Sequence, residues 1–416
     1  MAKEHLARPY GETFDVLTQE KEKSMLNRKL VIIGMLAAAS AAFAALAEEA
    51  SKADAAKTEA PKPALPSMDE LLGAWGLSLS GYLDASYMHA NRTPADRVFD
   101  NEQNSFALDQ AAITIAKQPK EGFGALVNVI AGRDAKVIHS SGLGTTEQVD
   151  LTQAYLQYAT GPFTVIGGKF TTLAGAEVIA PTGNTQYSRS LLFGAEPFTH
   201  TGIRGTYAPL DTLSLIVGVN NGWDQADDLN KQKTLELGAS YTPIKGLTLN
   251  AYDYYGNELA CNTLNPTPCT PTPQNGKRNL FDFVGSYSPI DPLSFNLEYL
   301  YVSQDGFISL VDASTIKAKY QGIAAYVNYM IAEQWRISLR GEYFKDTDGF
   351  KFGVPDNKVK EATLTLAYLP TKSIELRAEM RADKVSNPTD TGIFMGSDGT
   401  LSKSLFTYAM QAIYKF

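Results

Sequence analysis

Apolar and polar residues alternate one by one along the chain from Gly76 to its last residue. The alternation is clearest over residues 293–301, 335–343 and 374–383, where apolar residues or glycine occupy every second position. Because successive side chains of a β-strand point to opposite faces, this period predicts strands with one apolar and one polar face. The runs span about ten to fourteen residues, longer than typical soluble strands and long enough for a tilted strand to cross a bilayer. A soluble all-β fold is the alternative.

The connections between these runs alternate in length. Short connections lie near Pro119 and near residues 161–162, 209–211, 244–246, 290–292, 332–333 and 371–372. Long connections lie near residues 91–103, 135–147, 171–198, 222–233, 257–278, 304–318, 346–359 and 385–402. Together they join about sixteen strands, and both ends of the alternating region fall on the short-turn side. The sequence therefore predicts an all-β fold over residues 76–416, a transmembrane antiparallel up-and-down β-barrel with short periplasmic turns and long outer loops.

A Tyr-x-Pro tripeptide recurs four times on the short-turn side of the predicted strands. Each of its tyrosines has the apolar parity of its strand, and an aromatic ring at the membrane–water interface is typical of barrels. The tyrosines are Tyr207, Tyr241, Tyr287 and Tyr368. The repeat predicts an aromatic girdle at one edge of the membrane.

The last predicted strand places Tyr414 and Phe416 on its apolar face, and the chain stops on Phe416. This end resembles the signature by which outer-membrane barrels are recognised by their assembly machinery. We therefore predict an assembly signal at these two residues. The expected partners are the barrel assembly machinery and outer-membrane lipids.

The residues before the alternating region divide into three parts. Residues 25–47 combine a short basic start, an Ala-rich apolar core and an Ala-x-Ala motif, which are the parts of a secretory signal peptide. Residues 1–24 are interpreted as an extension that comes from a start-site error. Residues 48–75, rich in Ala, Lys, Glu and Pro at their start, are predicted to be a flexible periplasmic tether. The alternative is a chain anchored through an uncleaved apolar segment.

Composition excludes several other classes of protein. The mean hydropathy of -0.17 argues against a helical membrane protein. Lys and Arg number 37 against 45 Asp and Glu, a net charge of -8, which disfavours nucleic acid as a partner. The four histidines are too dispersed to suggest a metal site, and we expect no cofactor.

Short motifs of the alternating region resemble a known family, the OmpL-like putative beta-barrel porins. Residues 80–87 and 106–115 look like the first and second strands of that family. Central motifs of the family resemble residues 153–155, 168–170 and 187–204. The resemblance covers about residues 76–416 and implies a bacterial outer-membrane pore, without assigning any residue to a substrate.

The connection 171–198 is the third outer loop and the longest one. A loop longer than about 15 residues within a compact fold is usually functional or disordered. The third loop of porin-like barrels commonly folds inward, so we expect this one to narrow the pore. Candidate constriction residues are Glu177, Arg189 and Glu196 in the loop, with Lys169, His200 and Arg204 on the lumen parity of the flanking strands.

Two pairs of arginines share the lumen parity of the predicted strands thirteen and fifteen. They are Arg336 with Arg340 and Arg377 with Arg381. We expect a basic sector of the wall that faces the acids of the inward loop across a transverse field, because rings of charge set pore selectivity. Ordinary lumen ions solvated by channel water are the alternative. Since both signs of charge are present, we predict weak charge selectivity.

Cys261 and Cys269 are the only cysteines and lie on one Pro-rich outer loop. Two exported cysteines eight residues apart most simply form a disulfide. Zinc binding is a remote alternative, because no histidine is near.

The leading functional hypothesis is a porin for passive diffusion of small hydrophilic solutes and ions, and a homotrimer is the expected assembly. A channel specific for one anion or sugar class is a second hypothesis. A non-conducting surface adhesin or structural barrel is a third. We do not expect an enzyme, because His200 has no clear acid partner for a Ser-His-acid set. The expected location is the bacterial outer membrane.

Overall fold

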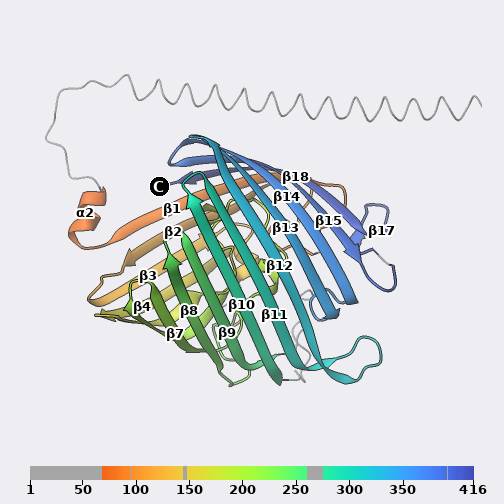
Figure 1. Cartoon of the computed structure of the whole chain (residues 1–416), viewed down its shortest axis with the longest axis horizontal. Helices are drawn as coiled ribbons and strands as arrows, with labels where there is room; N and C mark the ends of the chain where they lie inside the picture. The colour runs from red at the N-terminus through yellow and green to blue at the C-terminus, as the bar shows by residue number, and fades with distance from the viewer. Residues whose placement is uncertain (1–67, 95, 144–147, 260–274, 391) are drawn as a thin grey trace, which may run out of the picture. The chain divides into compact units, whose positions relative to one another are not determined.

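The computed structural model describes residues 68–94, 96–143, 148–259, 275–390 and 392–416. Within these residues, sixteen strands form one closed antiparallel β-barrel in which strands that follow each other along the chain pair side by side (Figure 1). The predicted up-and-down barrel is confirmed. Its strands are β1 (Ser78–Ala90), β2 (Ser105–Lys117), β3 (Gly122–Ala131), β4 (Val149–Thr160), β5 (Phe163–Thr171), β6 (Thr199–Leu210), β7 (Leu213–Asn220), β8 (Thr234–Ile244), β9 (Leu247–Leu259), β10 (Asn275–Ile290), β11 (Leu293–Ile308), β12 (Thr315–Ala332), β13 (Trp335–Asp348), β14 (Pro355–Thr371), β15 (Ile374–Ser386) and β18 (Ser404–Lys415).

Short elements accompany the barrel. The helix α2 (Met68–Ala74) precedes β1, and α3 (Ala135–Ile138) lies between β3 and β4. None of the helices in the described ranges has the length and apolar character needed to cross a bilayer. The remaining elements lie in loops: the 3-10 helices η1 (Pro181–Gly183) and η2 (Phe193–Ala195), and the hairpin of β16 (Phe394–Met395) and β17 (Leu401–Ser402).

The first and last strands close the barrel. β1 pairs with β18 from Tyr82↔Lys415 to Ala90↔Thr407. Beyond this ladder, the backbones of Gly81 and Phe416 exchange two hydrogen bonds of 2.9 and 3.0 Å. Closure leaves no unpaired strand edge, as a barrel in lipid requires, because lipid cannot satisfy backbone N–H and C=O groups.

Two of the predicted long loops are shorter in the structure than the sequence suggested. The predictions were residues 304–318 and 346–359, whereas only residues 309–314 and 349–354 lie outside the strands. Here the ladders of β11–β12 and β13–β14 continue into a stretch where both faces are largely polar. The period of two disappears from the sequence there, although the strands go on.

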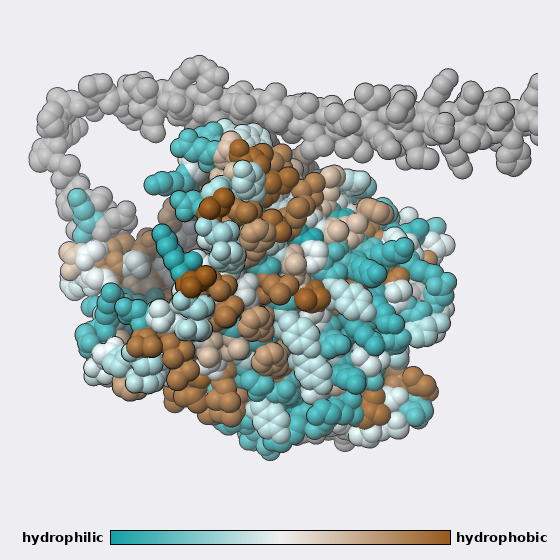
Figure 2. Space-filling model, in the orientation of Figure 1, coloured by the Kyte–Doolittle hydropathy of each residue, from teal (hydrophilic) through white to brown (hydrophobic). Residues whose placement is uncertain are grey.

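The outside of the barrel is apolar and its inside is polar. Large apolar side chains are exposed around the wall, with Phe106 85% and Phe123 78% exposed. Figure 2 shows such side chains gathered over the strands, with hydrophilic residues toward the end that carries the long loops. Many charged residues are buried inside, which inverts the pattern of a soluble protein and matches a barrel in lipid.

Aromatic side chains mark the short-turn edge of this apolar surface. Tyr207, Tyr241 and Tyr287 are exposed there, as predicted. Tyr368 packs against Trp335 with the ring centroids 4.7 Å apart. These outward rings lie at the level expected for an interfacial girdle.

Closure at Gly81 generates the first testable prediction. A Cβ added to Gly81 would lie 2.4 Å from the Phe416 ring and 2.6 Å from the backbone oxygen of Ala112. Because backbone cannot move aside easily, we expect Gly81→Ala to lower the free energy of unfolding by about 1–3 kcal/mol. The measurement is the temperature at which the barrel loses its heat-shifted gel mobility.

The matched control is Gly341→Ala on β13, because a Cβ there meets no atom within 4 Å. If both variants unfold at the same temperature, the crowding at Gly81 does not limit closure.

Candidate functional site

The loop between β5 and β6, residues 172–198, crosses the inside of the barrel. β13 lies eight strands away from β5 around the ring, yet both are in contact with this loop. Apolar residues of the loop are buried in two interior clusters together with side chains from the wall. A chain segment placed inside a barrel must find partners for its backbone N–H and C=O groups.

Carboxylates of the wall accept hydrogen bonds from the backbone N–H groups of the loop. These carboxylates come from four strands. Two of the carboxylates each accept hydrogen bonds from two successive N–H groups. Bonds to an ionised acceptor are stronger than bonds between neutral groups. The contacts are Asp282 with Gly175 at 2.9 Å, Glu298 with Ala176 at 3.1 Å, Glu379 with Tyr187 and Ser188 at 2.7 and 3.0 Å, and Glu342 with Leu191 and Leu192 at 2.9 and 3.1 Å.

Arginines of the wall donate hydrogen bonds to the carbonyl oxygens of the same loop. Arg377 alone binds three carbonyls, which its planar fork of donors makes possible. The contacts are Arg377 with Pro181, Asn184 and Gln186 at 3.1, 2.6 and 2.9 Å, Arg340 with Ser188 at 2.8 Å, and Arg381 with Arg189 at 2.6 Å. The wall therefore holds both kinds of backbone group of the loop.

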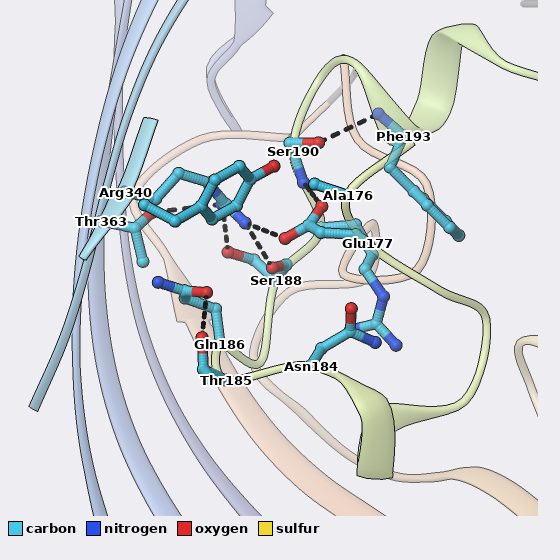
Figure 3. A network of polar contacts seen from close by, with 12 residues as sticks. Ala176, Glu177, Asn184, Thr185, Gln186, Ser188, Ser190, Phe193, Arg340 and Thr363 are labelled. Atoms are coloured by element: carbon cyan, nitrogen blue, oxygen red, sulfur yellow. Dashed lines mark hydrogen bonds and ion pairs between the residues drawn. The ribbon is translucent and has the colours of Figure 1, made fainter. Parts of the chain in front are cut away.

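Arg340 of β13 contacts both the loop, at Glu177 and Ser188, and the neighbouring strand β14, at Thr363 (Figure 3). Its guanidinium forms ion pairs with Glu177 of the loop at 2.8 Å and with Glu361 of β14 at 3.2 Å. The other oxygen of Glu177 accepts the N–H of Ser190 at 2.6 Å. Since the side chain of Arg340 is fully buried, its charge is balanced by these two carboxylates rather than by water.

The arginines of the predicted basic sector do not face the acids of the loop across the lumen. Three of the four lie buried beneath the loop. Arg340, Arg377 and Arg381 are only 2 to 3% exposed, because the loop lies directly on them. Glu177 touches Arg340 instead of facing it across a gap. Each arginine of the sector also pairs with a wall carboxylate: Arg336 and Arg377 with Glu375 at 2.5 and 2.7 Å, Arg340 with Glu361 at 3.2 Å, and Arg381 with Asp383 at 2.8 Å.

The other candidate residues lie in a second group near β5 and β6, or within the loop itself. Arg189 binds three carbonyl oxygens of its own loop. Lys169 pairs with Asp150 at 3.2 Å, and Arg204 pairs with Glu236 at 2.8 Å. His200 is buried, with its ring stacked on Tyr254 at 4.7 Å between centroids, and Glu196 lies beside Asp282 and Glu298.

Burial shifts the pKa of charged groups in the loops that connect the strands. Burial, together with the nearby carboxylates of Glu298 and Asp282, raises the pKa of Glu196 well above its usual range. Burial raises the pKa of Asp224 to about 6, against the lowering effect of two backbone N–H donors. Burial lowers the pKa of Lys351 to about 8. A charge in these surroundings is costly unless it has a partner.

A cavity of about 620 Å³ remains on the other side of the loop, beside β1 to β5. Its lining is mostly neutral, and Glu177 and Lys415 are the charged residues in it. The choice of candidate residues by charge missed this lining apart from Glu177, although the lumen parity of strands β2 to β4 could have indicated it. Its polar wall residues include Ser80, Thr114, Asn128, Thr152 and Gln153, its aromatic residues include Tyr82, Phe193 and Phe198, and aliphatic residues such as Ile130, Val178 and Ile179 complete it.

Some sequence predictions fall on residues that the structure does not describe. Cys261 and Cys269 belong to these, and so do the segments 1–24 and 25–47 and most of 48–75. The disulfide, the signal peptide and the tether stay predictions. Of the assembly signal, Tyr414 on β18 and Phe416 directly after this strand are exposed, and their recognition also stays a prediction.

A closed barrel with an apolar outside, an ionic inside and a long loop across its interior defines the class of outer-membrane porins and channels. The chain belongs to the family described as Putative beta-barrel porin-2, OmpL-like, which matches residues 76–416. It is therefore an outer-membrane barrel of the porin type. No curated protein sequence matches the chain at a significant level.

Solved structures share the fold at low sequence identity, so the likeness concerns the fold alone. OmpT, an outer membrane protein of Vibrio cholerae, aligns with a TM-score of 0.56 and 14% identity over 82% of this chain and 97% of its own. The outer membrane channel DcaP of Acinetobacter baumannii aligns with 0.55 and 16% over 82% and 97%. An anion-selective porin from Comamonas acidovorans aligns with 0.52 and 10% over 82% and 99%.

The attachment of the loop generates the second prediction. Arg340→Ala leaves the buried carboxylate of Glu177 without its cation and Glu361 with only Arg381 at 3.7 Å, and breaking a buried pair costs about 3–5 kcal/mol. We expect the variant to unfold at a lower temperature and its loop to be cut faster by trypsin after Arg189. The measurements are heat-shifted gel mobility and limited proteolysis.

Lys360→Ala is the control, since Lys360 is an exposed cation on the neighbouring strand β14. A cleavage rate at Arg189 equal to that of the unaltered protein in both variants would show that Arg340 does not hold the loop.

Proposed function

We propose that the barrel is a porin for passive diffusion of small hydrophilic solutes and ions, and that the loop 172–198 narrows its channel. The observation that carries the proposal is the cavity of about 620 Å³, with few charges and with both polar and apolar groups in its lining, left between the loop and strands β1 to β5. The loop fills the opposite side of the interior, where the arginines hold it. Solutes would therefore pass beside β1 to β5, and the arginines would anchor the constriction without lining it.

The proposed channel discriminates weakly between anions and cations. Its lining carries one acid, Glu177, and one base, Lys415, among uncharged hydroxyl, amide, aromatic and aliphatic side chains. Glu177 is already neutralised by Arg340, and Lys415 lies 3.4 Å from Glu375. Charge selectivity requires unbalanced fixed charges along the path, and this path has few of them.

A channel specific for neutral hydroxylated solutes is the second candidate. Amide and hydroxyl groups of Thr114, Asn128 and Gln153 share the cavity with the rings of Phe193 and Phe198. Hydrogen-bonding groups beside aromatic rings suit a solute that has both hydroxyl groups and apolar ring faces. A saturable block of ion current by a sugar would favour this candidate, whereas unspecific diffusion gives none.

The third prediction tests the path. Gln153→Trp places a large ring in the cavity, and we expect it to lower the single-channel conductance several-fold. The measurement uses the folded, full barrel in a planar lipid bilayer. The absence of conducting steps from a correctly folded barrel would contradict the porin and favour a surface adhesin or structural barrel.

Leu156→Trp is the matched control for this experiment. Leu156 lies on the same strand, β4, and is 71% exposed on the outer face. The same ring then meets lipid, and the conductance should not change. Equal conductance of both variants would place the path elsewhere in the lumen.

The fourth prediction concerns assembly, since we also propose a homotrimer. One structure of Vibrio cholerae OmpT is described as a trimer form. The strands on one side of this barrel are shorter than on the other, with 8 residues in β7 and 9 in β5 against 18 in β12. A second copy could pack against the side with the short strands. We expect three times the monomer mass for the unheated protein in mild detergent and a monomer after heating; a monomer before heating would contradict this.

Transport by this barrel needs no catalytic group, and we propose that the protein is not an enzyme. His200 supports this, because its ring nitrogen Nδ1 lies 3.1 Å from the carbonyl oxygen of Gly222 and its ring faces Tyr254. A serine nucleophile would need that ring within hydrogen-bonding distance.

A further inference from the structure

Three carboxylates gather where the inward loop passes β10 and β11. Glu196 follows η2 in the loop, Asp282 lies on β10 and Glu298 lies on β11. One carboxylate oxygen of each lies within 4.8 Å of the other two. All three residues are at most 5% exposed, so they share one water-poor site.

The negative charge of this site has no positive partner in the described part of the chain. The carboxylates near the arginine sector are balanced differently: Glu177 and Glu361 pair with Arg340, and Glu375 pairs with Arg377. The charges that act most on Glu196 are those of other carboxylates. Buried charges without compensation are strongly unfavourable, so three of them together call for a counter-ion.

Only some of the carboxylate oxygens of the site accept hydrogen bonds. One oxygen of Asp282 accepts the N–H of Gly175 at 2.9 Å, and one oxygen of Glu298 accepts the N–H of Ala176 at 3.1 Å. The second oxygen of each, and Oε1 of Glu196, are buried without a hydrogen-bond partner in the described residues. Buried polar atoms normally have a partner, so these free oxygens point to a ligand that supplies positive charge.

The chemistry of the oxygens suits a large, hard cation. Calcium takes carboxylate oxygens at about 2.4 Å in flexible geometry. One carboxylate oxygen of each residue lies within 4.8 Å of the other two, close enough for a single ion to contact all three. Magnesium demands a tighter octahedron at about 2.1 Å and keeps its water more firmly, which suits a dry carboxylate site less well.

Gly175 allows the loop to come this close to the carboxylates. Its φ is +92°, and a Cβ at this position would lie 2.3 Å from Oε2 of Glu196. Only glycine combines this left-handed backbone with the space that the carboxylate occupies.

We propose that Glu196, Asp282 and Glu298 bind a calcium-like divalent cation that fastens the end of the inward loop to β10 and β11. The cation balances these carboxylates as Arg340 balances Glu177. The loop is then held by arginines at its middle and by a metal ion near its end. The site does not depend on conduction, because the binding of the cation can be measured on a barrel that conducts or on one that does not.

Terbium luminescence tests the site directly. Tyr326 donates a hydrogen bond of 3.4 Å to Glu298, so its ring can sensitise a terbium ion bound there. The folded full barrel is washed with a chelator, titrated with terbium and then with calcium. We expect a saturable tyrosine-sensitised signal that calcium displaces more effectively than magnesium. Absence of a saturable signal would overturn the proposal.

Variants assign the signal to these residues. We expect Glu196→Gln, and separately Asp282→Asn, to weaken terbium and calcium binding at least about tenfold, as the loss of a charged ligand implies. Heat-shifted gel mobility shows for each variant that the barrel is folded. Because Glu196 lies in the loop and not in a strand, its variant is the one expected to fold if the other does not. Unchanged binding in a folded Glu196→Gln barrel would contradict the site.

Glu342→Gln is the matched control. Glu342 is a buried wall carboxylate that also holds two N–H groups of the loop, but it lies outside the cluster. Loss of binding in this variant as well would mean that any loosening of the loop abolishes the signal, which would overturn the assignment. Calcium should also raise the unfolding temperature of the unaltered barrel and of Glu342→Gln, but not that of Glu196→Gln. Stability that responds to pH and not to calcium would show that the carboxylates share protons instead.

Discussion

The need to satisfy the backbone of a loop inside the barrel governs the arrangement of the interior. Free peptide groups in such a place are as costly as lost hydrogen bonds, so the wall must provide donors and acceptors where the loop passes. Glu342 and Glu379 accept its N–H groups, and Arg377 and Arg381 donate to its carbonyls. Ionic side chains suit both tasks because they form the stronger hydrogen bonds. The charges of the lumen are therefore mainly structural.

This use of charge decides which groups border the remaining space inside the barrel. The arginines lie under the loop, and the remaining space beside β1 to β5 has a lining of mostly uncharged polar, aromatic and aliphatic groups. A porin with many lumen ions can consequently offer a nearly neutral path. The same reasoning isolates the cluster of Glu196, Asp282 and Glu298, where the wall supplies acceptors for the loop but no cation. A bound divalent cation would complete the pattern that arginine completes elsewhere.

The outer surface obeys a separate constraint, since lipid offers no hydrogen bonds to the backbone. The ladder must therefore close, and it closes where Gly81 and Phe416 exchange hydrogen bonds. The last residue of the chain thus has a structural role at the seam as well as its predicted role in assembly. The apolar outer face and the girdle tyrosines follow from the same constraint.

The sequence by itself determined the strand number, the topology and the face of each strand, because period two records directly which side chains meet lipid. It also singled out the connection 171–198 by its length and the arginines by their parity. It failed where the strands leave the membrane, as at residues 304–318, since both faces there are polar. Only the tertiary structure decided which lumen residues hold the loop and which border the cavity. Contacts such as Arg340 with Glu177, 163 residues apart, depend on the path of a loop without periodicity, and no local pattern records that path.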